Sequence, residues 1–474
     1  MMSPFHSTYS TERSLSKTLD WWLIVCYLLI AFFGWINIYA AIHTEDMSSI
    51  FDFSCRSGKQ FIWIMTSIVM AAVILFAIPP RIYEVIAPFL YVLVCCLLVA
   101  VIFLGSDIKG SHSWFKLGPI SFQPCELSKT ATSLMLATFM SRNGFKLQGR
   151  NFWMTAAIIL VPMLIIVLEK ETGSALVYVG FIFMLYREGL TGWLIALLGL
   201  LIVCFILTIT LSPFAGILLC LALISLFDAA QNGKWLLWAL IAIPLIVLNC
   251  FIPDKFATLA ISVESVIYLA YSGWRAFRGV HQQFRWFTIM TLAAMVLLCH
   301  SADFVFNNVL KDYQRGRIEV LLGMKDDLSG AGYNVHQSKI AIGSGGWIGK
   351  GFCQGTQTAY DFVPEQATDF IFCTVGEEWG FIGCVALIAL YVFMIIRIIG
   401  DSEHSRNSFT RIYGYCLASI LFMHLFINIG MTLGLMPVIG IPLPFMSYGG
   451  SSMWSFTIML FIFIALDKNE RKYF

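Results

Sequence analysis

Long apolar runs separated by short polar breaks fill most of this chain. A run of about 20 apolar residues crosses the roughly 30 Å hydrocarbon core of a membrane as a helix, because only a helix pairs its own backbone groups there. About fourteen such runs are predicted, several of them short, at residues 20–42, 61–79, 86–104, 123–140, 152–168, 173–186, 192–212, 214–228, 235–252, 257–272, 285–303, 366–398, 411–433 and 443–466. The pattern therefore predicts an all-α, polytopic bundle of membrane helices.

The composition supports this assignment. Apolar residues make up 59% of the chain and charged residues only 12%, whereas soluble domains carry about 45–50% and about 25%. A chain with so little charge cannot cover a water-facing surface. The 30 basic and 28 acidic residues nearly balance, so the positive excess of a nucleic-acid binder is missing and no nucleic-acid partner is expected.

The placement of Lys and Arg predicts the orientation of the spans. If the N-terminus lies inside, the cytoplasmic segments hold 17 basic residues and the short outer segments hold 6, and positive charge favours the cytoplasmic side. Both termini are therefore expected in the cytoplasm and the long loop 304–363 outside. The first run follows Arg13 and Lys17 but is too long for a signal peptide, so it is expected to remain as a span.

The first group of polar residues lies at the start of the run 123–140. Ionisable residues inside spans are costly and are therefore candidates for function. Glu126, Lys129, Thr130 and Ser133 fall on one face of a helix. This face either lines a wet cavity or holds a structural Glu–Lys pair, and the spacing alone leaves both alternatives open.

Further polar groups interrupt the runs on the outer side. Glu171 lies in a charged break at 169–174 that, taken alone, resembles a solvated turn. The loop 304–363 holds ten of the 36 glycines but no phosphate-binding glycine motif. Three prolines and two adjacent glycines break the chain at 436–452, and such breaks within membrane depth are tolerated only where they are buried or line a cavity.

An acidic pair follows the long outer loop. Pro364 is expected to open the next helix, with Glu365 and Asp369 on one face of its first two turns. A helix N-terminus stabilises carboxylates, so a capping role is the alternative for Glu365. Asp369 lies one turn deeper and precedes the apolar residues 370–372, which makes it the stronger candidate for a functional acid.

Seven motifs in this order resemble the SEDS family, the shape, elongation, division and sporulation proteins. They lie at residues 123–129, 313–318, 337–346, 349–357, 364–372, 376–378 and 442–452. The resemblance covers most of the chain except 213–303. The motifs at 313–318 and 355–357 are more similar to those of the elongation members than to those of the division members.

The resemblance implies a peptidoglycan glycosyltransferase that polymerises lipid II at the outer, periplasmic face of the bacterial cytoplasmic membrane during cell elongation. Its partners would be a class B penicillin-binding protein transpeptidase and other membrane proteins of the elongation complex. The family has ten spans, so the implied divisions are seven core spans in 1–212, about four additional spans in 213–303, the extracytoplasmic loop 304–363 and three core spans in 364–474.

The resemblance also implies roles for individual residues. Asp369 matches the catalytic acid and would act as general base on the C4 hydroxyl of the acceptor sugar, in one inverting displacement. Trp114 matches the functional tryptophan of the family and could stack on a sugar face, with anchoring at the membrane interface as the alternative. Lys129 is the preferred cation for the leaving pyrophosphate. The other substrate-binding candidates are Gln123, Glu126, Glu171, Glu365, Lys339 and Arg315, with Lys116 as a further cation.

The sequence identifies no certain cofactor. A divalent cation, Mg²⁺ or Mn²⁺, held by Glu126 or Glu171 is an alternative source of positive charge for the pyrophosphate. Glu171 stands where the family usually has an Asp, so its carboxylate is one methylene further from the backbone.

Two other functions are compatible with the sequence. A flippase for the lipid-linked precursor, or a secondary transporter, also has many spans and interrupted helices. Its site would lie near the membrane midplane, whereas Asp369 and Trp114 are expected at the outer face. A non-catalytic scaffold for cell-wall assembly is the third alternative, and it would form no product in a purified assay.

Overall fold

The computed structural model describes residues 18–43, 49–108, 111–117, 120–210, 213–231, 254–277, 282–304, 306, 308, 312–322, 324, 332–360 and 362–471. The run predicted at 235–252 lies outside these residues. The chain divides into two compact units, Met1–Leu190 with Leu328–Phe474, and Thr191–Asp327.

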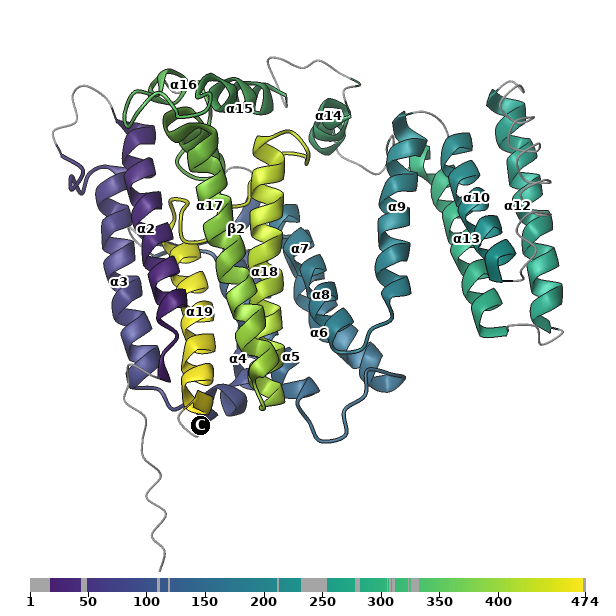
Figure 1. Ribbon diagram of the computed structural model, residues 1–474, viewed down its shortest axis with the longest axis horizontal. Helices are drawn as coiled ribbons and strands as arrows, with labels where there is room; N and C mark the ends of the chain where they lie inside the picture. Colours follow the sequence, from purple (N-terminus) through teal and green to yellow (C-terminus); the bar gives the residue numbers. More distant parts are fainter. Residues whose placement is uncertain are drawn as a thin grey trace, which may run out of the picture. The chain divides into compact units, whose positions relative to one another are not determined.

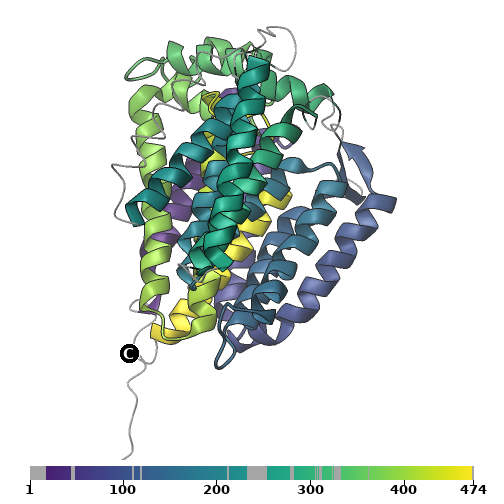
Figure 2. The same ribbon diagram turned by 90° about the vertical axis from the view of Figure 1, so that its right-hand side faces the viewer.

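The first unit is a bundle whose long helices have roughly parallel axes in both views (Figures 1 and 2). Its N-terminal part contains α2 (Trp21–Ile42), α3 (Arg56–Phe76), α4 (Arg81–Leu104), α5 (Pro124–Met140), α6 (Arg150–Leu168), α7 (Thr172–Val177), the 3₁₀ turn η1 (Tyr178–Gly180) and α8 (Phe181–Arg187). Its C-terminal part contains α15 (Tyr333–Ser344), α16 (Thr356–Ala359), α17 (Ile371–His404), α18 (Ser408–Thr432) and α19 (Gly450–Arg471).

The second unit contains α9 (Gly192–Thr210), α10 (Pro213–Gln231), α12 (Asp254–Phe277), α13 (Gln282–Phe304) and α14 (Asp312–Leu321). Its own small core is built around Cys204, Ile217 and Leu292. The described residues of the predicted insertion 213–303 all belong to this unit, which also includes α9 and α14.

Eight helices among the described residues are long and apolar enough to cross a membrane: α2, α3, α4, α6, α9, α17, α18 and α19. Their burial separates inner from outer helices. The apolar window of α18 is 89% buried and that of α4 only 22%. α18 and α19 therefore form the centre of the first unit, and α4 turns most of its apolar surface outward, as a lipid-facing helix must.

α5 is also a central helix, although its composition is much more polar. Pro124 occupies its first turn, where the missing N–H has no partner to lose. Glu126, Lys129 and Ser133 are all buried on it. A helix with this many buried polar groups is stable only if the neighbouring helices supply partners for them.

A small three-stranded antiparallel sheet follows α4 and was not expected from the sequence. It contains β1 (Ser106–Ile108), β2 (Ser111–Leu117) and β3 (Ile120–Phe122) in the order β1-β2-β3. Residues of β2 and β3 pair as Phe115 with Phe122 and Lys116 with Ser121. The sheet leads directly into Gln123 and α5.

α17 begins later than the sequence predicts. Pro364 was expected to open this helix, but residues 364–370 form turns and the helix starts at Ile371. The physical reason is the backbone of Glu365, whose φ of +55° lies in the left-handed region and cannot continue a right-handed helix. Glu365 and Asp369 therefore lie in a turn that precedes the span.

α17 is also broken at Gly380, where φ is +65° and ψ is −162°. The loop after α15 supplies partners for the backbone groups at this break. The amides of Phe381 and Ile382 donate to the carbonyls of Gly346 and Trp347 at 2.9 and 3.1 Å. These backbone amides at the break are therefore hydrogen-bonded within the protein, as backbone groups inside a membrane must be.

Candidate functional site

Glu126 and Lys129 form a buried ion pair on α5. The Lys129 Nζ to Glu126 Oε1 distance is 2.8 Å, and the two side chains are 2% and 4% exposed. Lys129 also donates to His424 Nε2 on α18 at 2.9 Å and lies 5.1 Å from the ring centroid of Phe456 on α19. The ammonium, which has three N–H groups, thus has two hydrogen-bond partners and one aromatic ring around it.

His424 connects this pair to the chain between α18 and α19. Its Nδ1 lies 3.0 Å from the Pro442 carbonyl oxygen, which accepts only, so Nδ1 carries the proton. Nε2 is then unprotonated and accepts from Lys129. The neighbours on both sides of the ring thus define one neutral tautomer.

Residues 439–442, which we call the central segment, also approach Asp369. The amide of Asn428 donates to the carbonyl of Asp369 at 2.9 Å and to that of Ile441 at 2.7 Å. A Cβ on Gly440 would lie 3.1 Å from Asp369 Oδ2. Gly440, with φ of +75°, therefore lets the Asp369 carboxylate lie close to the backbone of the central segment.

Further hydrogen bonds fix the turn that carries Asp369. Ser447 donates from its hydroxyl to the Thr368 carbonyl at 2.7 Å, and the Tyr448 amide donates to the Ala367 carbonyl at 2.9 Å. The Glu365 carboxylate accepts from the Thr368 hydroxyl at 3.0 Å. Asp369 itself is partly exposed, so its position is fixed while its carboxylate still reaches solvent.

Glu171 is tied to the sheet. The Ser113 hydroxyl donates to Glu171 Oε1 at 2.7 Å, and the Gln123 side-chain amide donates to the same oxygen at 3.3 Å. Two residues later, a Cβ on Gly173 would lie 2.9 Å from Ile439 and 3.0 Å from Ile441. The chain around Glu171 therefore packs on the central segment.

The central segment thus brings together three of the polar groups that the sequence singled out. Asp369 approaches it directly, Lys129 reaches it through His424, and the chain after Glu171 packs on it through Gly173. The arrangement places the partly exposed Asp369 beside a buried polar core that bonds to its backbone, which suits a proton acceptor that must keep one orientation.

The remaining sequence candidates lie on other elements. Trp114 is partly exposed on β2, next to Ser113. Lys116 on the same strand and Lys339 on α15 are exposed. Lys339 packs on Gly434, just after α18, where a Cβ would lie 2.7 Å from its Nζ. Arg315 belongs to the second unit, where it pairs with Glu319 at 2.8 Å.

The burial of Lys129 bears on the role expected for it. It was the preferred cation for a leaving pyrophosphate, but in this structure it is 1% exposed and its ammonium donates to Glu126 and His424. A buried ammonium that is already paired cannot meet a ligand without breaking those contacts.

The metal alternative does not fit the described side chains. Glu126 is held by Lys129, and Glu171 accepts from Ser113 and Gln123. In the part of the chain that the structure describes, no group of three or more His, Cys, Asp or Glu residues could hold a metal ion.

Sequence reasoning missed His424, Ser113 and Gly440. A signal existed for His424, since it is an ionisable residue in the middle of an apolar run. No local sequence pattern marks Ser113 and Gly440, because their contacts in the site are with residues far along the chain.

Comparisons with known proteins agree with this architecture. The family model of FtsW, RodA and SpoVE, described as cell cycle proteins, matches residues 20–243 and 226–472. The peptidoglycan glycosyltransferase MrdB of Escherichia coli K12 is 32% identical over 382 residues, which cover 80% of this chain and 77% of MrdB. The peptidoglycan glycosyltransferase RodA of Treponema pallidum is 28% identical over 460 residues, covering 95% and 98%.

Two solved structures share the fold. A chain of a peptidoglycan synthase complex that coordinates polymerization and crosslinking has a TM-score of 0.60 at 22% identity, covering 96% of this chain and 98% of that one. The rod shape determining protein RodA of Thermus thermophilus has a TM-score of 0.55 at 20% identity, covering 95% and 97%. These similarities confirm the polytopic all-α fold.

Proposed function

Because this chain belongs to the FtsW/RodA/SpoVE family of cell cycle proteins, we propose that it is a peptidoglycan glycosyltransferase of cell elongation. It polymerises lipid II at the outer face of the bacterial cytoplasmic membrane. The enzymatic assignment is supported by its relatives MrdB and RodA, which are named peptidoglycan glycosyltransferases. The neighbouring synthase complex supports a class B transpeptidase as partner.

One observation supports the site most directly: the partly exposed Asp369 carboxylate against the Gly440 backbone. In the proposed reaction, the C4 hydroxyl oxygen of the acceptor sugar bonds to C1 of the donor sugar. The bond from C1 to the polyprenyl pyrophosphate breaks, which inverts C1. Asp369 takes the hydroxyl proton, because an alcohol is a poor nucleophile until a base removes that proton.

The remaining residues divide into ligand-facing and positioning groups. Lys339 and Lys116 are exposed and are the cations that we assign to the developing charge of the pyrophosphate. Trp114 offers a partly exposed ring on which a sugar can stack. Lys129 and His424 hold the central segment beneath Asp369.

The test is polymerisation of purified lipid II by the full chain, with Asp369→Asn as the diagnostic variant. The amide cannot accept the hydroxyl proton, so we expect the rate to fall by about 10²–10⁴-fold while thermal unfolding changes little. Asp52→Asn is the matched control, because the Asp52 carboxylate accepts from the neighbouring Ser54 and Cys55, and it should keep the wild-type rate.

Wild-type polymer formation by Asp369→Asn would remove Asp369 as the base. Product formation in detergent also separates this function from its alternatives, since a flippase or a scaffold forms no glycan there. Adding the transpeptidase partner in a second arm tests whether it raises the rate.

A further inference from the structure

A polar cavity of about 470 Å³ lies in the first unit, outside the site described above. Its wall includes the loop between α5 and α6 and the start of α18. The side chains used in the following argument are Arg142, Lys146, Gln148, Glu188, Ser408 and Arg411. Nothing in the proposed reaction uses these residues.

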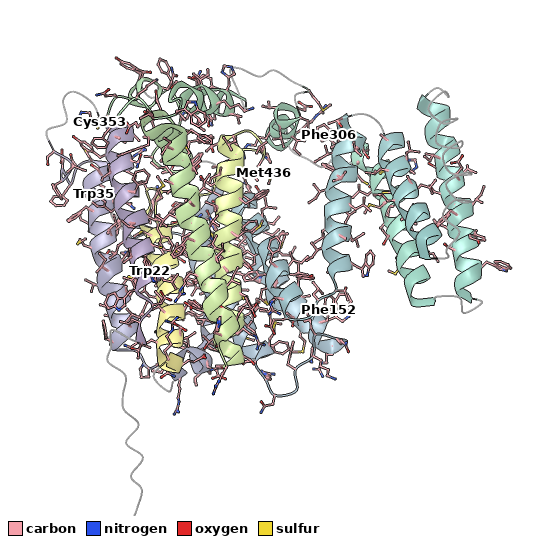
Figure 3. All side chains as sticks on the ribbon, viewed as in Figure 1. Trp22, Trp35, Phe152, Phe306, Cys353 and Met436 are labelled. Carbon is pink, nitrogen blue, oxygen red and sulfur yellow. The ribbon has the colours of Figure 1, made fainter. Side chains whose placement is uncertain are left out.

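The cavity lies at the end of the bundle opposite Asp369. α5 begins beside the site at Pro124 and ends at Met140 in the cavity wall, and its 17 residues rise about 26 Å. Figure 3 shows the same separation, because Phe152 at the start of α6 lies at the far end from Cys353 and Met436. In the orientation that we propose, this end faces the cytoplasm.

The charge of the cavity wall is positive. Arg411 is bound by the Glu188 carboxylate through two hydrogen bonds of 2.9 and 3.0 Å. Arg142 and Lys146, in contrast, have no carboxylate partner among the residues that the structure describes. The Arg142 guanidinium lies 5.0 Å from the Phe139 ring centroid, which orients it without neutralising its charge.

The loop keeps its shape without using these two basic side chains. Phe145 packs edge-on against Phe139, with ring centroids 5.6 Å apart. The Lys146 carbonyl accepts from the Gln148 amide at 2.8 Å and from the Asn151 side chain at 3.1 Å. Gly144, with φ of +74° and open space where a Cβ would be, makes the turn. The cavity is therefore preformed, and the side chains of Arg142 and Lys146 remain available to bind a ligand.

We propose that this cavity binds a phosphate-bearing anion on the cytoplasmic side, through Arg142 and Lys146. Basic pockets between membrane helices on this side suit lipid phosphate head groups, and guanidinium forks match phosphate oxygens in pairs. The Ser408 hydroxyl and the Gln148 side-chain amide supply neutral hydrogen-bonding groups. The phosphate is either the head group of an anionic lipid or a free phosphate ion.

The test measures lipid and phosphate binding to the purified full chain. Native mass spectrometry follows binding of phosphatidylglycerol or phosphatidylcholine, and thermal unfolding with and without inorganic phosphate forms the second arm. The diagnostic variant is R142Q/K146Q. Since each basic side chain near an anionic surface contributes about fivefold to affinity, this variant should bind phosphatidylglycerol about 25-fold more weakly.

The matched control is R81Q/R150Q, because Arg81 and Arg150 start α4 and α6 at the same end, are exposed and lie outside the cavity wall. It should bind like the wild type, and R142K/K146R should keep binding if R142Q/K146Q fails to fold. A preference for phosphatidylglycerol identifies a lipid source, and phosphate stabilisation alone identifies a soluble one. Equal binding by wild type and R142Q/K146Q, or an equal loss in the control, would overturn the proposal.

Discussion

The contact with His424 distinguishes between the two roles that the sequence leaves open for Lys129. Without it, the spacing of Glu126 and Lys129 allows either a ligand-facing cation or a structural pair. With His424 accepting at 2.9 Å and donating to Pro442 at 3.0 Å, the ammonium is held between Glu126 and His424. The sequence alone could not decide between these alternatives, because His424 is 295 residues from Lys129.

The buried pair predicts a difference between stability and activity. Lys129→Met leaves the Glu126 carboxylate buried and unpaired, which should cost about 3–5 kcal/mol of stability. Glu126→Gln combined with Lys129→Met removes both charges and should recover most of that loss, as measured by thermal unfolding. Polymerisation should stay low in both variants, since His424 has lost its donor. Full activity in the double variant would show that the pair is only structural.

Glu169 predicts a pH dependence of stability. It lies just after α6, is 1% exposed, and neither carboxylate oxygen has a hydrogen-bond partner in the structure. Burial, and secondly the nearby Glu171 carboxylate, raises the pKa of Glu169 from 4.5 to about 8. A carboxyl group whose pKa is raised on folding destabilises the folded state progressively as the pH rises from about 4.5 to about 8.

Glu169→Gln keeps the shape of the neutral acid and removes this titration. Its unfolding midpoint should therefore fall less between pH 6 and pH 9 than that of the wild type, by about 3 °C. Glu84→Gln, an exposed acid on α4, should follow the wild type at both pH values. Parallel curves for all three proteins would contradict the raised pKa.

At the scale of elements, the two breaks in the C-terminal helices build the site. The chain between α18 and α19 and the turn before α17 are held together by Asn428, Ser447 and Tyr448. The prolines and glycines predicted a break at 436–452 correctly. They did not predict that Glu365, through its left-handed backbone, delays the start of α17 and leaves Asp369 in a turn.

Substitution of Gly440 should disturb this arrangement and lower activity. Gly440→Ala strains the backbone at φ +75° and places a methyl group about 3.1 Å from Asp369 Oδ2. We expect polymerisation to fall by about 10²-fold, because small displacements of reacting groups have effects of this size. Gly346→Ala has similar strain at φ +56° but open space around its Cβ, so it should be destabilised similarly and stay active.

At the scale of the whole molecule, the outer helices of the first unit expose apolar surface, and the buried inner helices carry the polar groups. α3, α4 and α6 expose most of their apolar surface, whereas α5, α18 and α19 are mostly buried. A membrane bundle of this kind has its chemistry at the inner helices because lipid cannot solvate polar groups. Composition identified the membrane protein, but not which helices are central.

The orientation leads to a whole-molecule prediction. Tyr360→Cys, in a variant whose partly exposed Cys55 and Cys353 are replaced by serine, should react with a membrane-impermeant maleimide in intact cells. Arg150→Cys in the same background should react only after permeabilisation. Both positions are exposed, so a reversed labelling pattern would contradict the outward orientation of Asp369 rather than reflect burial.

The sequence by itself determined the class of fold, the family and the identity of most polar residues in the site, because membrane burial and short motifs leave strong local patterns. The tertiary structure alone decided which of these residues meet. Lys129, Glu171 and Asp369 come together around residues 439–442, which pack against helices from distant parts of the chain. Such contacts depend on how broken helices fold back on their neighbours, and no local pattern encodes that geometry.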